Sequence, residues 1–142
     1  RNAQNVIGDA QVRKYLDFAQ PMAICQVGTL CHVADEYDPW AIMSELIEAV
    51  ASGSYVVFAH LLEPGPDHEL AELAAQVQEV YLNGPIGSGW FRPVARIMDM
   101  LPGLELAEPG LVPLAEWWPD GPRSEPLAPM QRLLVGAVAR KP

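Results

Sequence analysis

The sequence predicts one α/β domain built on a mainly parallel sheet, and three observations carry this prediction. Two apolar segments, residues 22–28 and 55–60, have the length and composition of strands that are covered on both faces. Each is followed by a stretch with apolar side chains at helical spacing. Strands that alternate with helices are typical of a parallel sheet, because parallel neighbours need a long connection.

The first helix is predicted to begin at Asp38 and Pro39, directly after the loop that follows the first strand. An aspartate caps the N-terminus of a helix well, and proline suits the first helical position. Apolar side chains then recur at helical spacing over residues 40–50. The second strand, residues 55–60, is rich in β-branched and aromatic side chains, which favour a sheet.

A second helix is predicted after the second strand. Asp67 is the expected N-cap, residues 70–81 carry the apolar stripe, and residues 83–84 end the helix. A shorter helix is expected to begin at Pro93, to place Leu101 inward and to stop directly after it.

The last third of the chain is predicted to supply an antiparallel edge. Residues 104–114 and 132–138 are strand candidates, and the proline-rich residues 116–129 between them fit neither a strand nor a helix. Without a helix between them, two such strands pair antiparallel or lie apart. The predicted sheet is therefore parallel with an antiparallel edge.

Composition and charge limit the classes of partner and the location. The chain has 142 residues, is 50% hydrophobic and carries a formal net charge of −9. That charge disfavours nucleic acid and anionic membranes, which are themselves negative. No apolar run approaches the roughly 20 residues that cross a bilayer, and the start lacks a signal-peptide pattern. The only cysteines, Cys25 and Cys31, give no disulfide framework, so a cytoplasmic protein is expected.

Several segments resemble class I S-adenosylmethionine-dependent methyltransferases. Residues 27–33, the acidic Asp35 and Asp38, and the small-residue turn 52–54 before the next strand resemble the unit that joins the fourth and fifth strands of that fold. The pattern shared with that fold is a Leu-x-His turn, an acidic loop, a helix and a second apolar strand.

The end of the chain gives a more specific resemblance. GLELAEPGLVP at residues 103–113, WPDGP at 118–122 and VGAVARKP at 135–142 resemble the ending of a bacterial family of these methyltransferases whose substrates are mostly unassigned. The likeness runs from about Asn5 to Pro142. It implies a Rossmann-like sheet.

The resemblance also implies that residues 1–142 are the C-terminal portion of a single methyltransferase-like domain. The Asp-x-Gly glycine-rich turn after the first strand and the acidic residue after the second, which the family uses for the cofactor, are not found in the sequence. The N-terminal strands are thus expected to be missing. The implied function is methyl transfer from S-adenosyl-L-methionine to a small-molecule acceptor.

Two alternatives stay open for the function. A truncated or degenerate methyltransferase fold would serve as a non-catalytic interaction module, and a homodimer fits either reading. A nicotinamide-dependent oxidoreductase would share the sheet but would need a Gly-x-Gly-x-x-Gly turn, which the sequence does not show.

The candidate cofactor-binding residues are Asp9, which the resemblance suggests, and Gly28, Thr29 and Leu30, whose position suggests that they line a cofactor or substrate site. Gly8 and Asp9, after the apolar pair Val6 and Ile7, resemble the end of the third strand, where a carboxylate holds the adenine amino group. Residues 28–30 lie at the carboxyl end of a strand, the edge at which α/β sheets bind ligands. A helix-cap aspartate and an ordinary strand end are the structural alternatives.

His32 is the candidate catalytic base, because an imidazole exchanges a proton near neutral pH. For His32 the alternative is a structural or cofactor-facing histidine, and the same alternatives hold for His60. His68 is expected to be exposed.

Trp90 and Arg92 are candidate substrate-binding residues in a lid after a glycine-rich turn, with packing under a loop as the alternative. No metal is predicted, because the nearby group lacks a zinc-like ligand spacing. That group is His32, Asp35, Glu36 and Asp38.

Overall fold

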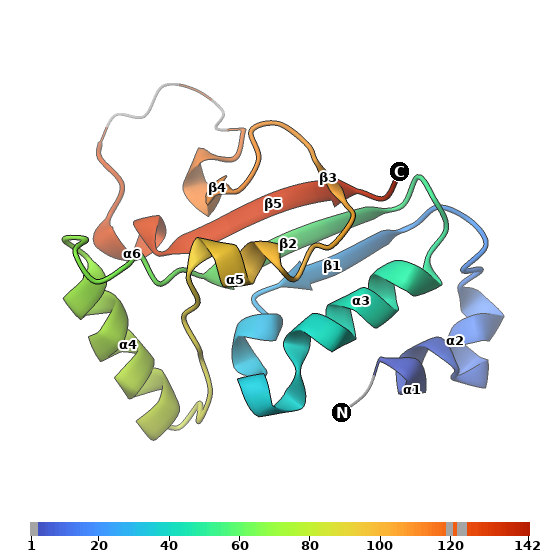
Figure 1. The fold of residues 1–142 in the computed structure, drawn as a ribbon, viewed down its shortest axis with the longest axis horizontal. Helices are drawn as coiled ribbons and strands as arrows, with labels where there is room; N and C mark the ends of the chain where they lie inside the picture. Colours follow the sequence, from blue (N-terminus) through green and yellow to red (C-terminus); the bar gives the residue numbers. More distant parts are fainter. Residues whose placement is uncertain (1–2, 119–120, 122–124) are drawn as a thin grey trace.

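A computed structural model describes residues 3–118, 121 and 125–142 as helices around one mixed sheet (Figure 1). The strand order is β1-β2-β5-β3, with β4 also paired to β5. β1 and β2 are parallel, and β5 is antiparallel to β2, β3 and β4. The prediction of a parallel sheet with an antiparallel edge is therefore confirmed. The strands are β1 (Ala23–Val27), β2 (Tyr55–Leu61), β3 (Glu105–Leu106), β4 (Val112–Pro113) and β5 (Leu134–Arg140).

The helices cluster on one side of the sheet and beyond its ends. α3 and α5 pack on the sheet, α4 stands beyond the carboxyl ends of β1 and β2, and α1 and α2 lie on the opposite side of the molecule (Figure 1). The helices are α1 (Gln4–Ile7), α2 (Ala10–Tyr15), α3 (Pro39–Ala49), α4 (Ala71–Asn83), α5 (Val94–Met98) and α6 (Pro129–Arg132). Three short 3-10 turns are η1 (Leu30–His32), η2 (Asp35–Tyr37) and η3 (Leu114–Glu116).

The start of α3 is as predicted, whereas the start of α4 is not. Asp38 accepts a hydrogen bond at Oδ1 from the backbone N–H of Ala41, at 3.0 Å. Asp67 does not cap α4, which begins at Ala71 with no side-chain cap on its N-cap residue. Nδ1 of His68 accepts the nearby N–H of Leu70 instead, at 3.1 Å, so this histidine supplies the local hydrogen bond; its side chain is exposed, as predicted.

The strand predicted over residues 104–114 is wrong, because the chain turns in its middle. Only the short β3 and β4 pair with β5, and Gly110, with a φ of +87°, bends the chain between them. The N–H of Gly110 donates to the carbonyl of Ala107 across this turn. The stretch between the predicted C-terminal strands also holds two short helical turns, η3 and α6.

The core lies between the sheet and the two helices on it. Val56 and Phe58 of β2 pack there with Met43 of α3 and Ile97 of α5, and all four side chains are buried. The predicted helix from Pro93 ends early, at Met98, yet Leu101 is buried in this core as expected.

The opposite face of β1 is uncovered, which contradicts the prediction that this strand is covered on both faces. Ala23, Cys25 and Val27 alternate as exposed positions along it, and Val27 keeps 54% of its surface accessible. β1 is also an outer strand of the sheet. Among the described residues, β1 is therefore covered on one face only, although its apolar side chains occupy both faces.

No helix within residues 3–118, 121 and 125–142 combines the length and apolar character needed to cross a membrane.

Candidate functional site

A cavity of about 440 Å³ opens where β1 and β2 end, and we call it the strand-end cavity. Its walls come from the ends of three strands, η1, the last turn of α4, the loop after α4, and α6. The residues that line it are Gly28, Cys31, His32, Leu61, Tyr81, Ile86, Met130, Gln131 and Leu134.

Gly28 leaves the backbone open at the tip of β1. Its φ is +66°, a conformation that favours glycine, and a Cβ at this position would meet no atom within 4 Å. Its N–H donates to the carbonyl of Ala59 at 3.2 Å, which keeps the tip beside β2. A ligand can therefore approach the backbone here without displacing a side chain.

Thr29 and Leu30 differ in what they can offer to a ligand. Thr29 is exposed, and its hydroxyl donates to Oε1 of Gln26. The Leu30 side chain is buried in the core, and its carbonyl accepts a hydrogen bond from Arg92 at 3.2 Å. Only the backbone N–H of Leu30 is therefore left to serve a cofactor-binding role.

His32 is held by a hydroxyl on the loop after α4. Its Nδ1 lies 3.0 Å from Oγ of Ser88. Oγ of Ser88 also lies 3.4 Å from the carbonyl of Ile86, and a hydroxyl that donates to this carbonyl can accept from Nδ1 of His32. When Ser88 accepts in this way, Nδ1 of His32 carries the proton and Nε2 is the basic nitrogen; in the other tautomer, Ser88 donates to Nδ1. Among the described residues, Nε2 has no hydrogen-bond partner.

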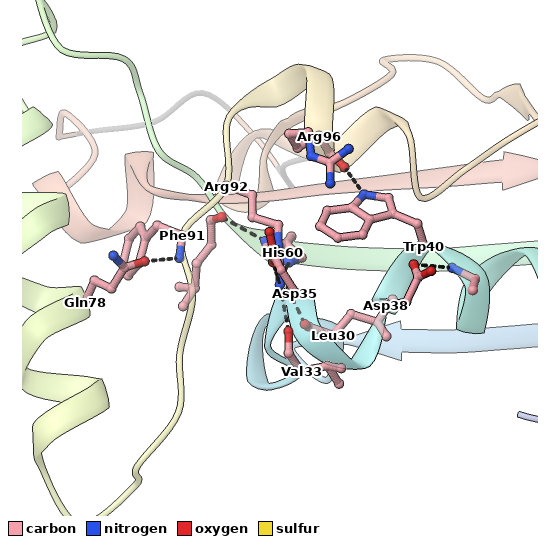
Figure 2. Close-up of polar contacts among 12 residues, drawn as sticks. Leu30, Val33, Asp35, Asp38, Trp40, His60, Gln78, Phe91, Arg92 and Arg96 are labelled. Atoms are coloured by element: carbon pink, nitrogen blue, oxygen red, sulfur yellow. Dashed lines mark hydrogen bonds and ion pairs between the residues drawn. The ribbon is translucent and has the colours of Figure 1, made fainter. Parts of the chain in front are cut away.

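Arg92 is the most highly connected side chain near the strand ends (Figure 2). Its side chain is 4% exposed. Nε and Nη2 donate to Oδ1 of Asp35, at 3.1 and 2.7 Å. Nη2 also donates to the carbonyl of Val33 at 2.7 Å, while Nη1 donates to the carbonyl of Leu30 and to Nε2 of His60. All five N–H groups are thus used within the protein, which makes Arg92 the anchor of the loop after β1.

His60 is the last residue but one of β2 and is fully buried against this guanidinium. Its Nδ1 donates to the carbonyl of Leu61 at 2.8 Å, and its Nε2 accepts from Arg92 at 2.9 Å. Burial, followed by the charge of Arg92, lowers the pKa of His60 to about 4. A neutral His60 that accepts a hydrogen bond has a structural role here, the alternative that the sequence left open.

The segment from Trp90 to Arg92 links the loop after α4 to the strand ends. The N–H of Trp90 donates to the carbonyl of Cys31 at 2.7 Å, and the N–H of Phe91 donates to Oε1 of Gln78 at 2.7 Å. The N–H of Arg92 donates to the carbonyl of Leu61. This segment runs beside the end of β2, but Trp90 and Arg92 are not among the residues that line the strand-end cavity.

Trp40 contacts two arginine side chains near the start of α3. Its ring lies 5.3 Å from the guanidinium carbon of Arg92 and 3.6 Å from that of Arg96, and its Nε1 donates to the carbonyl of Arg96 (Figure 2). Because Trp40 and Asp35 flank the same guanidinium, the loop before α3 is held from two sides.

Asp9 lies far from the strand ends. Val6 and Ile7, which the resemblance placed at the end of a strand, belong to α1, so that part of the resemblance is wrong. Asp9 caps α2, and its Oδ1 accepts the N–H groups of Gln11 and Val12. α1 and α2 lie on the side of the molecule opposite to α4 (Figure 1). The structure therefore does not bring Asp9 together with Gly28, Thr29 and His32.

Some wall residues of the cavity were not singled out from the sequence. Tyr81, Ile86 and Met130 come from three separate segments and meet only through the fold. Tyr81 lies near the end of a helix, where the sequence indicated only the apolar stripe of that helix. Ile86 lies in the glycine-rich turn after the end of that helix. Within the described part of the chain, no group of at least three His, Cys, Asp or Glu side chains is arranged to hold a metal ion.

The fold is that of class I methyltransferases. A SAM-dependent methyltransferase from Thermotoga maritima, described as a possible histamine N-methyltransferase, superposes with a TM-score of 0.54 at 18% identity over 89% of this chain and 58% of its own. A likeness at this identity shows the fold alone.

Residues 1–142 match the family described as S-adenosyl methyltransferase, and the chain belongs to that family. No curated protein matches the chain. Two solved structures are much more similar in fold than the Thermotoga protein. A candidate methyltransferase from Thermobifida fusca YX has a TM-score of 0.85 and 27% identity over 98% of this chain. A DUF574-family protein from Streptomyces avermitilis MA-4680 has a TM-score of 0.84 and 28% identity over 99%.

The chain spans about half the length of these two proteins, because the match covers 50% and 52% of their own chains.

Proposed function

We propose that this protein acts in methyl transfer from S-adenosyl-L-methionine to a small-molecule acceptor in the cytoplasm. The observation that carries the proposal is the match of residues 1–142 to the S-adenosyl methyltransferase family. The open backbone at Gly28, at the carboxyl end of β1, supports it, because α/β sheets bind ligands at that edge. The net charge of −9 argues for a small acceptor rather than a nucleic acid.

The residues at the tip of β1 fit one side of a bound cofactor. Gly28 allows close backbone approach, Thr29 is exposed, and Leu30 offers its backbone N–H. Asp9, the proposed adenine partner, would have to give up a helix cap and lies away from this edge. When bound, the cofactor supplies a methyl group on a positively charged sulfur.

The chain's own residues supply position and a proton acceptor. Arg92 holds residues 30–35 in place through Leu30, Val33 and Asp35. That arrangement orients the tip of β1 and His32 toward one region, and orientation supplies much of the acceleration in such transfers. A base is needed only if the acceptor atom carries a proton, and His32 is the group we assign to that role.

A non-catalytic interaction module is the second candidate function. Exposed apolar positions on β1 and its place at the edge of the sheet favour it, because an unpaired strand edge can pair with another chain. A homodimer formed through β1 is one form that such a module would take.

A glycine substitution tests the cofactor role. Gly28→Ala and Gly103→Ala are matched, because both glycines have φ near +65° to +70° and neither would place a Cβ within 4 Å of another atom. Each is expected to cost about 1 to 2 kcal/mol of stability. In a version that carries an N-terminal region of the length found in the two similar structures, only Gly28→Ala should weaken S-adenosylhomocysteine binding, by about tenfold, in a calorimetric titration. Equal affinities in the two variants would count against Gly28 as a cofactor contact.

A further inference from the structure

We propose that the strand-end cavity binds the methyl acceptor, and that this acceptor is a neutral, mostly apolar small molecule with a hydroxyl group placed at His32. The inference rests on the proposed methyl transfer and adds the chemical class of the acceptor. The volume of about 440 Å³ falls in the range of small-molecule sites.

The lining of the cavity argues against a charged acceptor. Leu61, Ile86, Met130 and Leu134 give apolar walls, and no Lys, Arg, Asp or Glu side chain is among the described lining residues. A carboxylate or phosphate would lose its hydration without gaining an ionic partner, and an obligate cation would meet the same difficulty. The protein's negative charge adds to the penalty for an anion.

A cavity of similar volume, about 460 Å³, shows the contrast. Its lining includes His68, Glu116 and Arg132, and so carries charge of both signs. It includes none of the residues at the tip of β1. The strand-end cavity is the one that Gly28 and His32 share.

The polar end of the cavity is set up to receive a proton. In this proposal, His32 has the tautomer in which Nδ1 donates to Ser88, which leaves Nε2 as the proton acceptor. In the transfer, the acceptor oxygen forms a bond to the methyl carbon, and the carbon–sulfur bond breaks with its electron pair on sulfur. The hydroxyl proton passes to Nε2 of His32 and then to solvent. The products are a methyl ether, S-adenosylhomocysteine and one proton.

The loop after α4 gives the cavity its outer wall. A Cβ on Gly89 would lie 2.4 Å from Cδ2 of Tyr81, so only glycine lets the loop pack this closely on that ring. Ile86, which is 58% exposed, forms a wall that can be changed without disturbing the core.

The first test compares 2-naphthol with 2-naphthoate, which share the rings and differ in charge at neutral pH. The chain should bind naphthol saturably and naphthoate about tenfold or more weakly in ligand-observed NMR titrations. Ile86→Lys should lower the ratio of naphthol to naphthoate affinity about fivefold, because it adds a cation to the wall. Val80→Lys, at an exposed position of α4 that does not line the cavity, should leave the ratio unchanged. Equal binding of the two probes, or an equal effect of both lysines, would overturn the proposal.

The second test addresses His32. His32→Gln should weaken naphthol binding about three- to tenfold, through the lost hydrogen bond, and leave naphthalene binding within about twofold. An equal loss for both probes would mean that His32 only shapes the wall. Circular dichroism spectra that match the unsubstituted chain show that each variant is folded.

Separate readouts distinguish this proposal from the proposed function. If a version extended by the N-terminal region binds S-adenosylhomocysteine but not naphthol, the acceptor class is wrong and methyl transfer stands. If it binds naphthol but not S-adenosylhomocysteine, methyl transfer fails and with it the assignment of the cavity to an acceptor. If the added region abolishes the naphthol binding seen with the chain alone, the cavity is an internal contact surface, and the proposal is overturned.

Discussion

Arg92 shows how one side chain can organise the approach to a candidate site. The sequence suggested that it binds substrate, and that role stays a prediction. In the structure its donors reach partners 57 to 62 residues away along the chain, at Asp35 and Leu30, as well as His60. No local pattern signals contacts of this range, so the sequence could not indicate them.

Arg92→Lys tests the anchoring role. A lysine cannot donate to Asp35, Val33 and Leu30 from one planar group, so buried carbonyls lose their partners. We expect a loss of about 2 to 4 kcal/mol in the free energy of unfolding, measured with urea. Arg96→Lys is the matched control, because Arg96 is exposed, and its change should stay within about 1 kcal/mol. Similar losses in the two variants would refute the anchoring role.

His60 predicts how stability depends on pH. The pKa of His60 is about 4 in the folded chain and 6.5 for an ordinary histidine. Between about pH 4 and pH 6.5, the histidine is therefore protonated in the unfolded chain but neutral in the folded chain. Its contribution is intact above about pH 6.5 and is lost as the pH falls toward about 4. Unfolding free energy should drop by about 2 kcal/mol between about pH 7 and pH 5 from this residue.

Urea titrations of two variants isolate the His60 contribution. His60→Gln should remove most of the pH-dependent loss, whereas His68→Gln, which changes an exposed histidine, should keep it. If His60→Gln retains the full loss, the proton is taken up elsewhere.

At the scale of elements, local sequence signals predicted which segments form strands and helices better than they predicted where those elements begin and end. The apolar runs of β1 and β2 and the Asp38–Pro39 start of α3 carry their own physical reasons and were predicted correctly. The start of α4 and the break between β3 and β4 depend on a histidine nitrogen and on a glycine turn, which propensity alone does not single out. The cavity walls depend on the meeting of three distant segments.

The open face of β1 gives its two neighbouring cysteines different reactivity. Cys25 is exposed on that face, whereas Cys31 is buried and its pKa is raised by burial. Iodoacetamide should alkylate Cys25 at least about tenfold faster than Cys31, as followed by peptide mass spectrometry. Cys25→Ser identifies the fast site. Equal rates would show that the face is covered or that the fold opens freely.

At the scale of the whole molecule, the chain is shorter than the solved structures that it resembles. It spans about half the length of the similar structures from Thermobifida and Streptomyces, and β1 offers an unpaired edge with exposed apolar side chains. A region of comparable length placed before residue 1 is expected to add strands beside the free edge of β1. The sequence analysis expected N-terminal strands to be missing because the glycine-rich cofactor turn is not found, and that stays a prediction.

The most direct test of the methyltransferase assignment is a calorimetric titration with S-adenosylhomocysteine. It compares the chain with a version that carries an N-terminal region of the length found in the two similar structures. We predict saturable binding by the longer version and binding at least about tenfold weaker, or none, by the chain alone. Absence of binding by a folded longer version would contradict the assignment.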